Sequence, residues 1–362
     1  MLYYKDPKYN FVEFFNPQNG TLIRTNIIKK NVETAIEPYM RSFPELIDIG
    51  VMGTCYAGLS GICRNAGVDC YQNATTYQRK NMSVEKYETI ITQCKSKTFQ
   101  VALGGAGDPN KHENFEQLLR ITRDNNIVPN LTTSGYNISE HEIELMKTYC
   151  GAVAVSFYST LNKNGFETNM NTISTIHKLI ACGCITNIHY VISTQNIDEV
   201  IFRLENNMFP DGINAIIFLL YKPVGLASKD KMLTASDPRY LKFLELIANN
   251  KTDFKIGFDS CQTPAVLNFC STVATESLEF CEAARFSMYI DCDLIAYPCS
   301  FGHDCDAYSV DLSKFSIAEA WNSKIFEMFR LKQNEMCSYC SQNVICRNCA
   351  LDIGLNVCGK IK

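Results

Sequence analysis

The distribution of cysteine is the feature of this 362-residue sequence that most limits its possible folds. Of its 18 cysteines, three lie close together at Cys55, Cys63 and Cys70, and eleven lie from Cys261 to Cys358. A reducing compartment keeps thiols from pairing, so such spacing indicates metal binding rather than disulfides. The remaining cysteines are predicted to be buried small apolar residues; they are Cys94, Cys150, Cys182 and Cys184.

Composition excludes several classes of protein. Apolar residues make up 46% and charged residues 20%, which is ordinary for a globular protein with a core. The net charge is −4 and no dense Lys/Arg stripe is present, which argues against a nucleic-acid partner. The first residues contain no apolar signal region, and no run of about 18 apolar residues occurs. We therefore expect a cytoplasmic protein that does not bind nucleic acid or a membrane.

From about residue 46, short apolar runs alternate with amphipathic stretches, a pattern typical of βα units on a parallel sheet. The predicted strands have the nearly continuous aliphatic character of strands buried on both faces; they span 46–52, 99–103, 127–132, 151–157, 186–192 and 215–220. Helices are predicted over 114–125 and 140–149. Successive units of this kind favour a partial (β/α)6 TIM-like barrel over an open, doubly wound sheet.

The pattern also predicts the division of the chain. Residues 1–44 are an N-terminal extension of two short strands and a helix over 31–41, and residues 45–225 form the barrel. Residues 226–260 connect the domains, with a helix over 238–249. Residues 261–362 form a small cysteine-rich α+β domain, in which short strands and cysteine-bearing loops replace the alternation. We expect metal to stabilise this domain more than core burial does.

The first cysteine group directly follows the first predicted strand. That position is the C-terminal mouth of a barrel, where barrel enzymes carry their chemistry. A structural zinc site uses four protein ligands and is closed. Three thiolates on a four-iron cluster instead leave one iron open to a ligand. The spacing of Cys55, Cys63 and Cys70 therefore favours an iron–sulfur cluster with one free iron.

The C-terminal cysteines carry the most specific motif, Cys337-x2-Cys340-x5-Cys346-x2-Cys349, followed by Cys358. Two CxxC pairs at this distance indicate a metal site, and four thiolates would suit either zinc or iron–sulfur. Six further cysteines lie upstream, at Cys261, Cys270, Cys281, Cys292, Cys299 and Cys305. They exceed what one zinc ion can use, so two four-iron clusters with eight thiolates account for the pattern better.

Three features together resemble the radical S-adenosylmethionine (SAM) superfamily. They are the cysteine triplet after the first strand, the glycine-rich turn Gly104-Gly105-Ala106-Gly107-Asp108-Pro109 after the second strand, and the late cysteine array. More narrowly, the chain resembles members with a C-terminal SPASM auxiliary-cluster domain, many of which modify ribosomal peptides. The gaps within the triplet are seven and six residues here, longer than is usual in the family.

The resemblance implies a SAM site at the mouth of the barrel. Gly104, Gly105, Ala106, Gly107 and Asp108 stand where the family has a GGEP-type turn that binds the amino group of SAM, with Asp108 in place of Glu. Polar residues of later strands would contact the ribose and carboxylate of SAM, namely Ser134, Ser156, Asn187 and His189. Leu219 of the sixth strand would lie against the adenine. No general base is assigned.

The resemblance also implies two auxiliary [4Fe–4S] clusters, which with the SAM-binding cluster make three. The ligands of one would be Cys261, Cys281, Cys299 and Cys349, and those of the other Cys337, Cys340, Cys346 and Cys358. Cys299 would end a hairpin in which Leu294 replaces the usual glycine. Cys270, Cys292 and Cys305 are left over, either as free thiols or as replacements for an assigned ligand.

The function implied is a radical SAM oxidoreductase. Such an enzyme cleaves SAM reductively to a 5′-deoxyadenosyl radical, with ferredoxin or flavodoxin as electron donor. The preferred substrate is a ribosomally synthesised precursor peptide, which the enzyme would modify by cross-linking. Two alternatives remain open at this point: a radical SAM enzyme acting on a small metabolite or a folded protein, and a cysteine-rich zinc or redox protein without SAM chemistry.

Overall fold

The computed structural model describes residues 1–29, 32–33, 40–76, 78–249, 252–335, 337, 340, 346 and 349–359. Within these ranges, a ten-stranded sheet forms the centre of the molecule. Its parallel body comprises β6 (Leu46–Gly50), β7 (Gln100–Gly104), β8 (Val128–Thr133), β9 (Val153–Ser156), β10 (Thr186–Ile192), β11 (Ala215–Leu220) and β12 (Lys255–Phe258). Each strand pairs in parallel with the next one along the chain.

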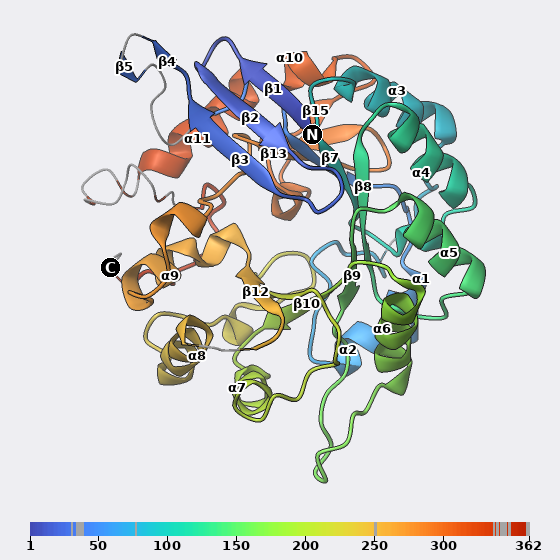
Figure 1. The fold of residues 1–362 in the computed structure, drawn as a ribbon, viewed down its shortest axis with the longest axis vertical. Helices are drawn as coiled ribbons and strands as arrows, with labels where there is room; N and C mark the ends of the chain where they lie inside the picture. The colour runs from blue at the N-terminus through green and yellow to red at the C-terminus, as the bar shows by residue number, and fades with distance from the viewer. Residues whose placement is uncertain are drawn as a thin grey trace.

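This strand order identifies the winding of the sheet. A doubly wound sheet reverses its strand order at a switch point, whereas the order here runs from β6 to β12 without reversal. Right-handed crossovers then place every connecting helix on the same face. Six helices accordingly form an arc around the outside of the strands (Figure 1): α3 (Val84–Cys94), α4 (Phe115–Asp124), α5 (Glu140–Tyr149), α6 (Met170–Cys182), α7 (Ile197–Glu205) and α8 (Pro238–Ala248).

Side chains alternate between the helix layer and the lumen of the barrel. On β10, Ile188 and Tyr190 are buried in the apolar core. Asn187 and His189, which alternate with them along the strand, line an internal pocket. The outer face of the strands is thus apolar and packs under the helices, as expected for a parallel sheet. The lumen, in contrast, carries polar groups.

The partial barrel agrees closely with the prediction. All six predicted strands are confirmed, as are the helices predicted over 114–125, 140–149 and 238–249. The prediction missed β12, which lies in the segment expected only to connect the domains. Its four residues, Lys-Ile-Gly-Phe, are too short and too mixed to show a strand pattern. Pairing with β11 stabilises it as the last strand of the parallel body.

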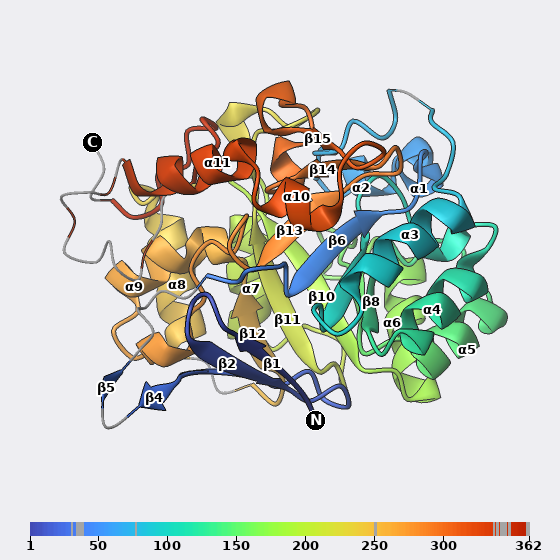
Figure 2. The ribbon, with the colours of Figure 1, turned by 90° about the horizontal axis from the view of Figure 1, so that it is seen from above.

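The N-terminal extension differs from the prediction of two strands and a helix. It forms an antiparallel meander of β1 (Leu2–Asp6), β2 (Phe11–Phe15) and β3 (Leu22–Asn26). The helix expected over 31–41 lies largely outside the described residues, and Val32–Glu33 within it is a strand, β5, paired with β4 (Ile28–Lys29). Phe15 stacks on Phe99 with ring centroids 5.3 Å apart, which attaches the meander to the base of the barrel. Figure 2 shows the meander at the end of the strands opposite α1 and α2.

The C-terminal region continues the same sheet. β13 (Ser287–Ile290) pairs in parallel with β6, and β14 (Ile295–Tyr297) and β15 (Val310–Asp311) extend the sheet in antiparallel fashion. The region also contains α9 (Thr263–Phe269), α10 (Ile317–Trp321) and α11 (Lys324–Glu335). Trp321 and Phe326 are fully buried in the core that the barrel shares, so core burial contributes to this region. The larger contribution expected from metal stays a prediction.

Candidate functional site

The first cysteine group lies on two short helices rather than on an open loop. Cys55 caps α1 (Tyr56–Ser60), and its Sγ accepts a hydrogen bond from the backbone N–H of Gly58 at 3.1 Å. Gly61 ends α1 in the left-handed conformation, with φ +79°, and turns the chain into α2 (Ile62–Asn65), which carries Cys63. The long gaps in the triplet are thus filled by helical turns that bring the cysteines back toward one another.

The three thiols lie within electrostatic range of each other. Burial raises the pKa of the Cys55 thiol to about 12, and Asp108, Cys70 and Cys63 add to this rise. Burial also raises the pKa of Cys63, and Cys70 contributes. Negative charge on one thiol therefore disfavours negative charge on the others, as expected for groups that become thiolates only when a metal holds them.

The segment that carries Cys70 is anchored to the loop after β11. The Asp69 carboxylate accepts hydrogen bonds from the Tyr221 hydroxyl at 2.7 Å and from Lys231 Nζ at 2.6 Å. The backbone N–H of Leu226 donates to the Cys70 carbonyl at 2.9 Å. These contacts hold Cys70 over the mouth of the barrel.

The glycine-rich turn after β7 packs directly against the first cysteine segment. A Cβ atom on Gly107 would lie 2.5 Å from the Thr54 carbonyl oxygen, so only glycine allows this approach. Gly105 has φ +92°, and a Cβ there would lie 2.9 Å from the Tyr289 hydroxyl. The predicted SAM turn and the predicted cluster ligands are therefore neighbours in space.

Two other predicted SAM contacts, Asp108 and Ser134, meet at the same turn. The Asp108 carboxylate accepts hydrogen bonds from the backbone N–H and the hydroxyl of Ser134, both at 2.6 Å. Burial raises the pKa of Asp108, and the two bonds from Ser134 oppose this rise. Ala106 in the turn is also buried. Asp108 thus ties the turn after β7 to the end of β8.

The remaining predicted SAM contacts face the lumen. Ser156 at the end of β9 lies opposite His189 in the strand register, and Leu219 lies opposite Val191 one strand further along. Burial lowers the pKa of His189 to about 4, so its imidazole is neutral at neutral pH. Asn187 lies deeper, where its side-chain oxygen accepts a hydrogen bond from the Asn214 side chain at 2.7 Å.

A pocket of about 340 Å³ occupies the lower lumen and reaches the base of the barrel. Thr132, Asn187 and His189 line it, together with Phe15 and Pro17 of the N-terminal meander. Asn187 and His189 therefore border a cavity that extends away from the glycine turn. Of the predicted SAM contacts, the turn residues and Ser134 lie together, whereas Asn187 lies toward the base.

The cysteines assigned to the first auxiliary cluster also influence one another. Burial raises the pKa of Cys299, and Cys281, Cys261 and Cys349 raise it further. Cys281 has its pKa raised to about 12 by burial, with Cys349 contributing. The fold thus brings Cys281 close to Cys349, although 68 positions separate them in the sequence. The predicted β13–β14 hairpin that leads to Cys299 is present.

The second auxiliary set is described only in part. Cys337, Cys340, Cys346 and Cys358 are described, but most of 336–348 lies outside the described residues. This ligand set therefore stays a prediction.

The cysteines that were not assigned as ligands divide into two kinds. Cys94, Cys270 and Cys292 are buried, and Cys270 and Cys292 show no electrostatic coupling to the predicted ligands. Cys305 is only partly buried. The other three are partly exposed, which corrects the expectation of full burial; they are Cys150, Cys182 and Cys184.

The thiols do not converge on one point. Among the described residues, no three Cys, His, Asp or Glu side chains gather closely enough to hold a single metal ion. A four-iron cluster makes a different demand, because each thiolate binds a separate iron at a corner of the cluster. Three or four mutually coupled thiols fit that larger group better than a closed zinc site.

Sequence reasoning missed a buried ion pair at the mouth of the barrel. Lys222 follows β11, Asp259 follows β12, and the lysine ammonium contacts the Asp259 carboxylate. Lys222 Nζ also donates to the Leu220 carbonyl oxygen at 3.0 Å. The signal was available, because polar residues just beyond a strand at this mouth were the basis for singling out Ser134.

Tyr71 links the two cysteine regions. It follows Cys70 directly, and its ring lies 4.6 Å from that of Phe301, two residues after Cys299. Burial raises the pKa of Tyr71 to about 12, and both Cys70 and Cys299 contribute to this rise. Tyr71 thus lies within electrostatic range of both the cysteine triplet and the first auxiliary set.

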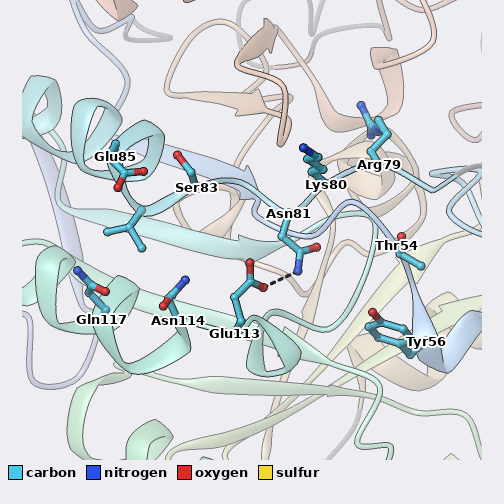
Figure 3. A pocket seen from close by; sticks show the side chains of 11 residues that line it. Thr54, Tyr56, Arg79, Lys80, Asn81, Ser83, Glu85, Glu113, Asn114 and Gln117 are labelled. Carbon is cyan, nitrogen blue, oxygen red and sulfur yellow. Dashed lines mark hydrogen bonds between the residues drawn. The ribbon is translucent and has the colours of Figure 1, made fainter.

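A second pocket lies outside the barrel. It has a volume of about 610 Å³ and is lined by polar residues near the start of α3 and α4, including Lys80, Ser83 and Asn114. Figure 3 shows Asn81 and Glu113 joined by a hydrogen bond of 2.7 Å across it. None of the predicted cluster ligands or SAM contacts lines this pocket, so size alone does not mark the candidate site.

The architecture is that of proteins solved with SAM and with peptides. The crystal structure of Streptococcus suis SuiB bound to precursor peptide SuiA aligns at a TM-score of 0.68 and 16% identity, covering 96% of this chain and 93% of that one. SuiB bound to S-adenosylmethionine aligns at a TM-score of 0.64 and 18% identity, covering 86% of this chain and 73% of that one. Native anSMEcpe with bound AdoMet and Cp18Cys peptide aligns at a TM-score of 0.57 and 16% identity, covering 84% of this chain and 88% of that one.

These similarities confirm the predicted fold, a partial barrel with a cysteine-rich C-terminal region. No protein-family model and no curated protein sequence matches the chain. Within the described ranges, every helix is too short or too polar to span a bilayer.

Proposed function

We propose that this protein is a radical SAM enzyme that modifies a ribosomally synthesised peptide by cross-linking. Cys55, Cys63 and Cys70 would hold a [4Fe–4S] cluster with one open iron. A SPASM-like region from 261 to 362 would hold two auxiliary clusters, and residues 45–225 would form the SAM-cleaving barrel. Ferredoxin or flavodoxin would supply the electron.

One observation carries this proposal: Cys55, Cys63 and Cys70 lie at the mouth of a partial barrel, where the glycine turn after β7 packs against the Cys55 segment. A SAM molecule bound there would meet the thiol-held metal at one end and bare backbone at the other. When bound, the cluster and SAM together supply the 5′-deoxyadenosyl radical, which removes a hydrogen atom from the substrate.

The chain's own residues provide binding and shielding. Gly104 and its neighbours expose backbone groups to a ligand, and Asp108 holds this turn in place through Ser134. His189 is neutral and partly buried, so it can offer a hydrogen bond without introducing charge into the lumen. The helices around the barrel exclude water, which protects a reactive radical from side reactions.

A peptide substrate is supported by the structural neighbours. SuiB was solved with the precursor peptide SuiA, and anSMEcpe was solved with the Cp18Cys peptide. The present chain covers more than four-fifths of both structures. A protein of the same architecture would accept a substrate of the same kind.

SAM cleavage is tested with a matched pair of cysteine variants. After anaerobic reconstitution and reduction, the wild type should form 5′-deoxyadenosine from SAM. Cys63→Ala should abolish this activity but leave most of the C-terminal iron in place, whereas Cys305→Ala, which changes an unassigned cysteine, should keep it. Cleavage of SAM by Cys63→Ala at the wild-type rate would contradict the assignment of the triplet.

The substrate class is tested separately. Co-expression with a precursor peptide encoded beside the gene, followed by mass spectrometry, should show loss of two hydrogens for each cross-link formed. Formation of 5′-deoxyadenosine without any change in peptide mass would favour a small metabolite or a folded protein as the substrate. Purified protein that contains zinc and lacks the visible absorbance of iron–sulfur clusters would contradict both.

A further inference from the structure

A buried lysine lies beside the cysteines of the first auxiliary set. Lys222 leaves the end of β11, and its side chain is only 2% exposed. Its Nζ lies 4.3 Å from the centre of the Phe301 ring, in the loop that follows Cys299. A lysine is almost never buried this completely without a partner or a function.

The surroundings of Lys222 favour its charged form. Its ammonium contacts the Asp259 carboxylate, and its Nζ donates a hydrogen bond to the Leu220 carbonyl oxygen at 3.0 Å. An opposite charge at contact distance favours the charged form of a buried group.

Lys222 lies beside the segments that carry two of the predicted cluster ligands. Its ion-pair partner Asp259 stands two residues before Cys261. Phe301, whose ring faces the lysine ammonium, stands two residues after Cys299. The lysine charge is therefore held next to the position proposed for this cluster.

A protein sets the reduction potential of an iron–sulfur cluster partly through net charge and through hydrogen bonds to the sulfur atoms. Reduction adds one electron to the cluster. A fixed positive charge nearby stabilises the added negative charge, and a low-dielectric interior strengthens the effect. Positive charge at this position therefore makes the cluster easier to reduce.

We propose that Lys222, held in place by Asp259, raises the reduction potential of the auxiliary cluster on Cys261, Cys281, Cys299 and Cys349. This inference rests on the proposed function, because it requires that cluster to be present. An auxiliary cluster that is easier to reduce is suited to accept the electron that a substrate radical releases when it forms a new bond. Lys222 is accordingly a positioning residue that acts through the cluster and does not touch the substrate.

The test is a reduction titration followed by electron paramagnetic resonance. The background is Cys55→Ala/Cys63→Ala/Cys70→Ala, which removes the SAM-binding cluster and its signal. The signal of the first auxiliary cluster is identified as the one that disappears when Cys281→Ala is combined with this background. Iron is measured first, and about eight irons per chain are expected from two four-iron clusters.

Lys222→Met should make reduction of that cluster at least tenfold less favourable, which is about 59 mV for a one-electron couple. Lys222→Arg keeps the charge and should stay within about threefold of the parent. Lys242→Met is the matched control, because it removes the same charge from an exposed pair between Lys242 of α8 and Glu205 of α7. It should not shift the potential.

A second variant allows for the chance that Lys222→Met fails to retain the cluster. Lys222→Met/Asp259→Asn removes both charges and leaves no unpaired carboxylate. It should lie between the parent and Lys222→Met. The inference is overturned if the reduction potential of Lys222→Met equals that of the parent. If Lys222→Met loses the cluster, the same comparison is made with the double variant. A potential shift in Lys222→Arg as large as that in Lys222→Met would also overturn the inference. Absence of the eight irons would instead refute the proposed function.

Discussion

Gly107→Ala offers a sharp test of how the glycine turn and the first cysteine segment fit together. A methyl group at this position would lie 2.5 Å from the Thr54 carbonyl oxygen, 3.0 Å from Met52 Cβ and 3.4 Å from Cys55 Cα. The nearest of these atoms is backbone, so a side-chain rotation cannot relieve the contact. We expect a loss of about 1–3 kcal/mol in the free energy of unfolding, the usual range for an overpacked interior.

The same displacement should move Cys55 away from its partners. We therefore expect Gly107→Ala to bind less iron at the first cluster as well as to unfold at a lower urea concentration. The assays are urea denaturation under anaerobic conditions and iron content in a protein whose C-terminal cysteines are unchanged. Both readouts should move together, because one steric contact causes both.

Gly104→Ala is the matched control, at the end of β7. A methyl group there would meet only Thr132 Cβ, at 4.0 Å. Because alanine loses less backbone freedom than glycine in a strand, this variant should be as stable as the wild type or more stable by about 0.5–1 kcal/mol. Equal stability and iron content in Gly107→Ala and Gly104→Ala would refute the reasoning.

Two further predictions concern stability. Glu13→Gln should lower the free energy of unfolding by about 3–5 kcal/mol in a urea titration, because it leaves Arg41 buried without its ionic partner at 2.7 Å. The control is Glu140→Gln, in an exposed pair with Lys178, which should lower it by less than about 1 kcal/mol. His189 has its pKa lowered by burial from 6.5 to about 4, so only the unfolded chain takes up its proton as the pH falls below about 6.5. From about pH 7.5 to about pH 5.5, the wild type should therefore lose about 1 kcal/mol more stability than His189→Asn, and equal losses would contradict the burial of a neutral imidazole.

Local pattern was sufficient to predict the barrel. Ala215–Leu220 occupies the predicted residues and is apolar from end to end, as a run buried on both faces is. Thr186–Ile192 also occupies the predicted residues, and in it apolar residues alternate with Asn187 and His189. The position of Cys55 after the first strand likewise placed the candidate site at the mouth. In contrast, β12 and β13 were not predicted as part of the barrel sheet, because their four-residue runs become strands only by pairing with β11 and β6.

The candidate site divides in the same way. Sequence spacing was enough to group the cysteines and to find the glycine turn, because both depend on residues close together in the chain. The pairing of Lys222 with Asp259, 37 residues apart, depends on where two strands end in space. The approach of Cys281 to Cys349 and of Tyr71 to Phe301 likewise depends on how the C-terminal region docks on the barrel. Sequence alone thus determined which groups are present, and only the tertiary structure decided which of them share a buried environment, because charges interact strongly only where the fold removes the water between them.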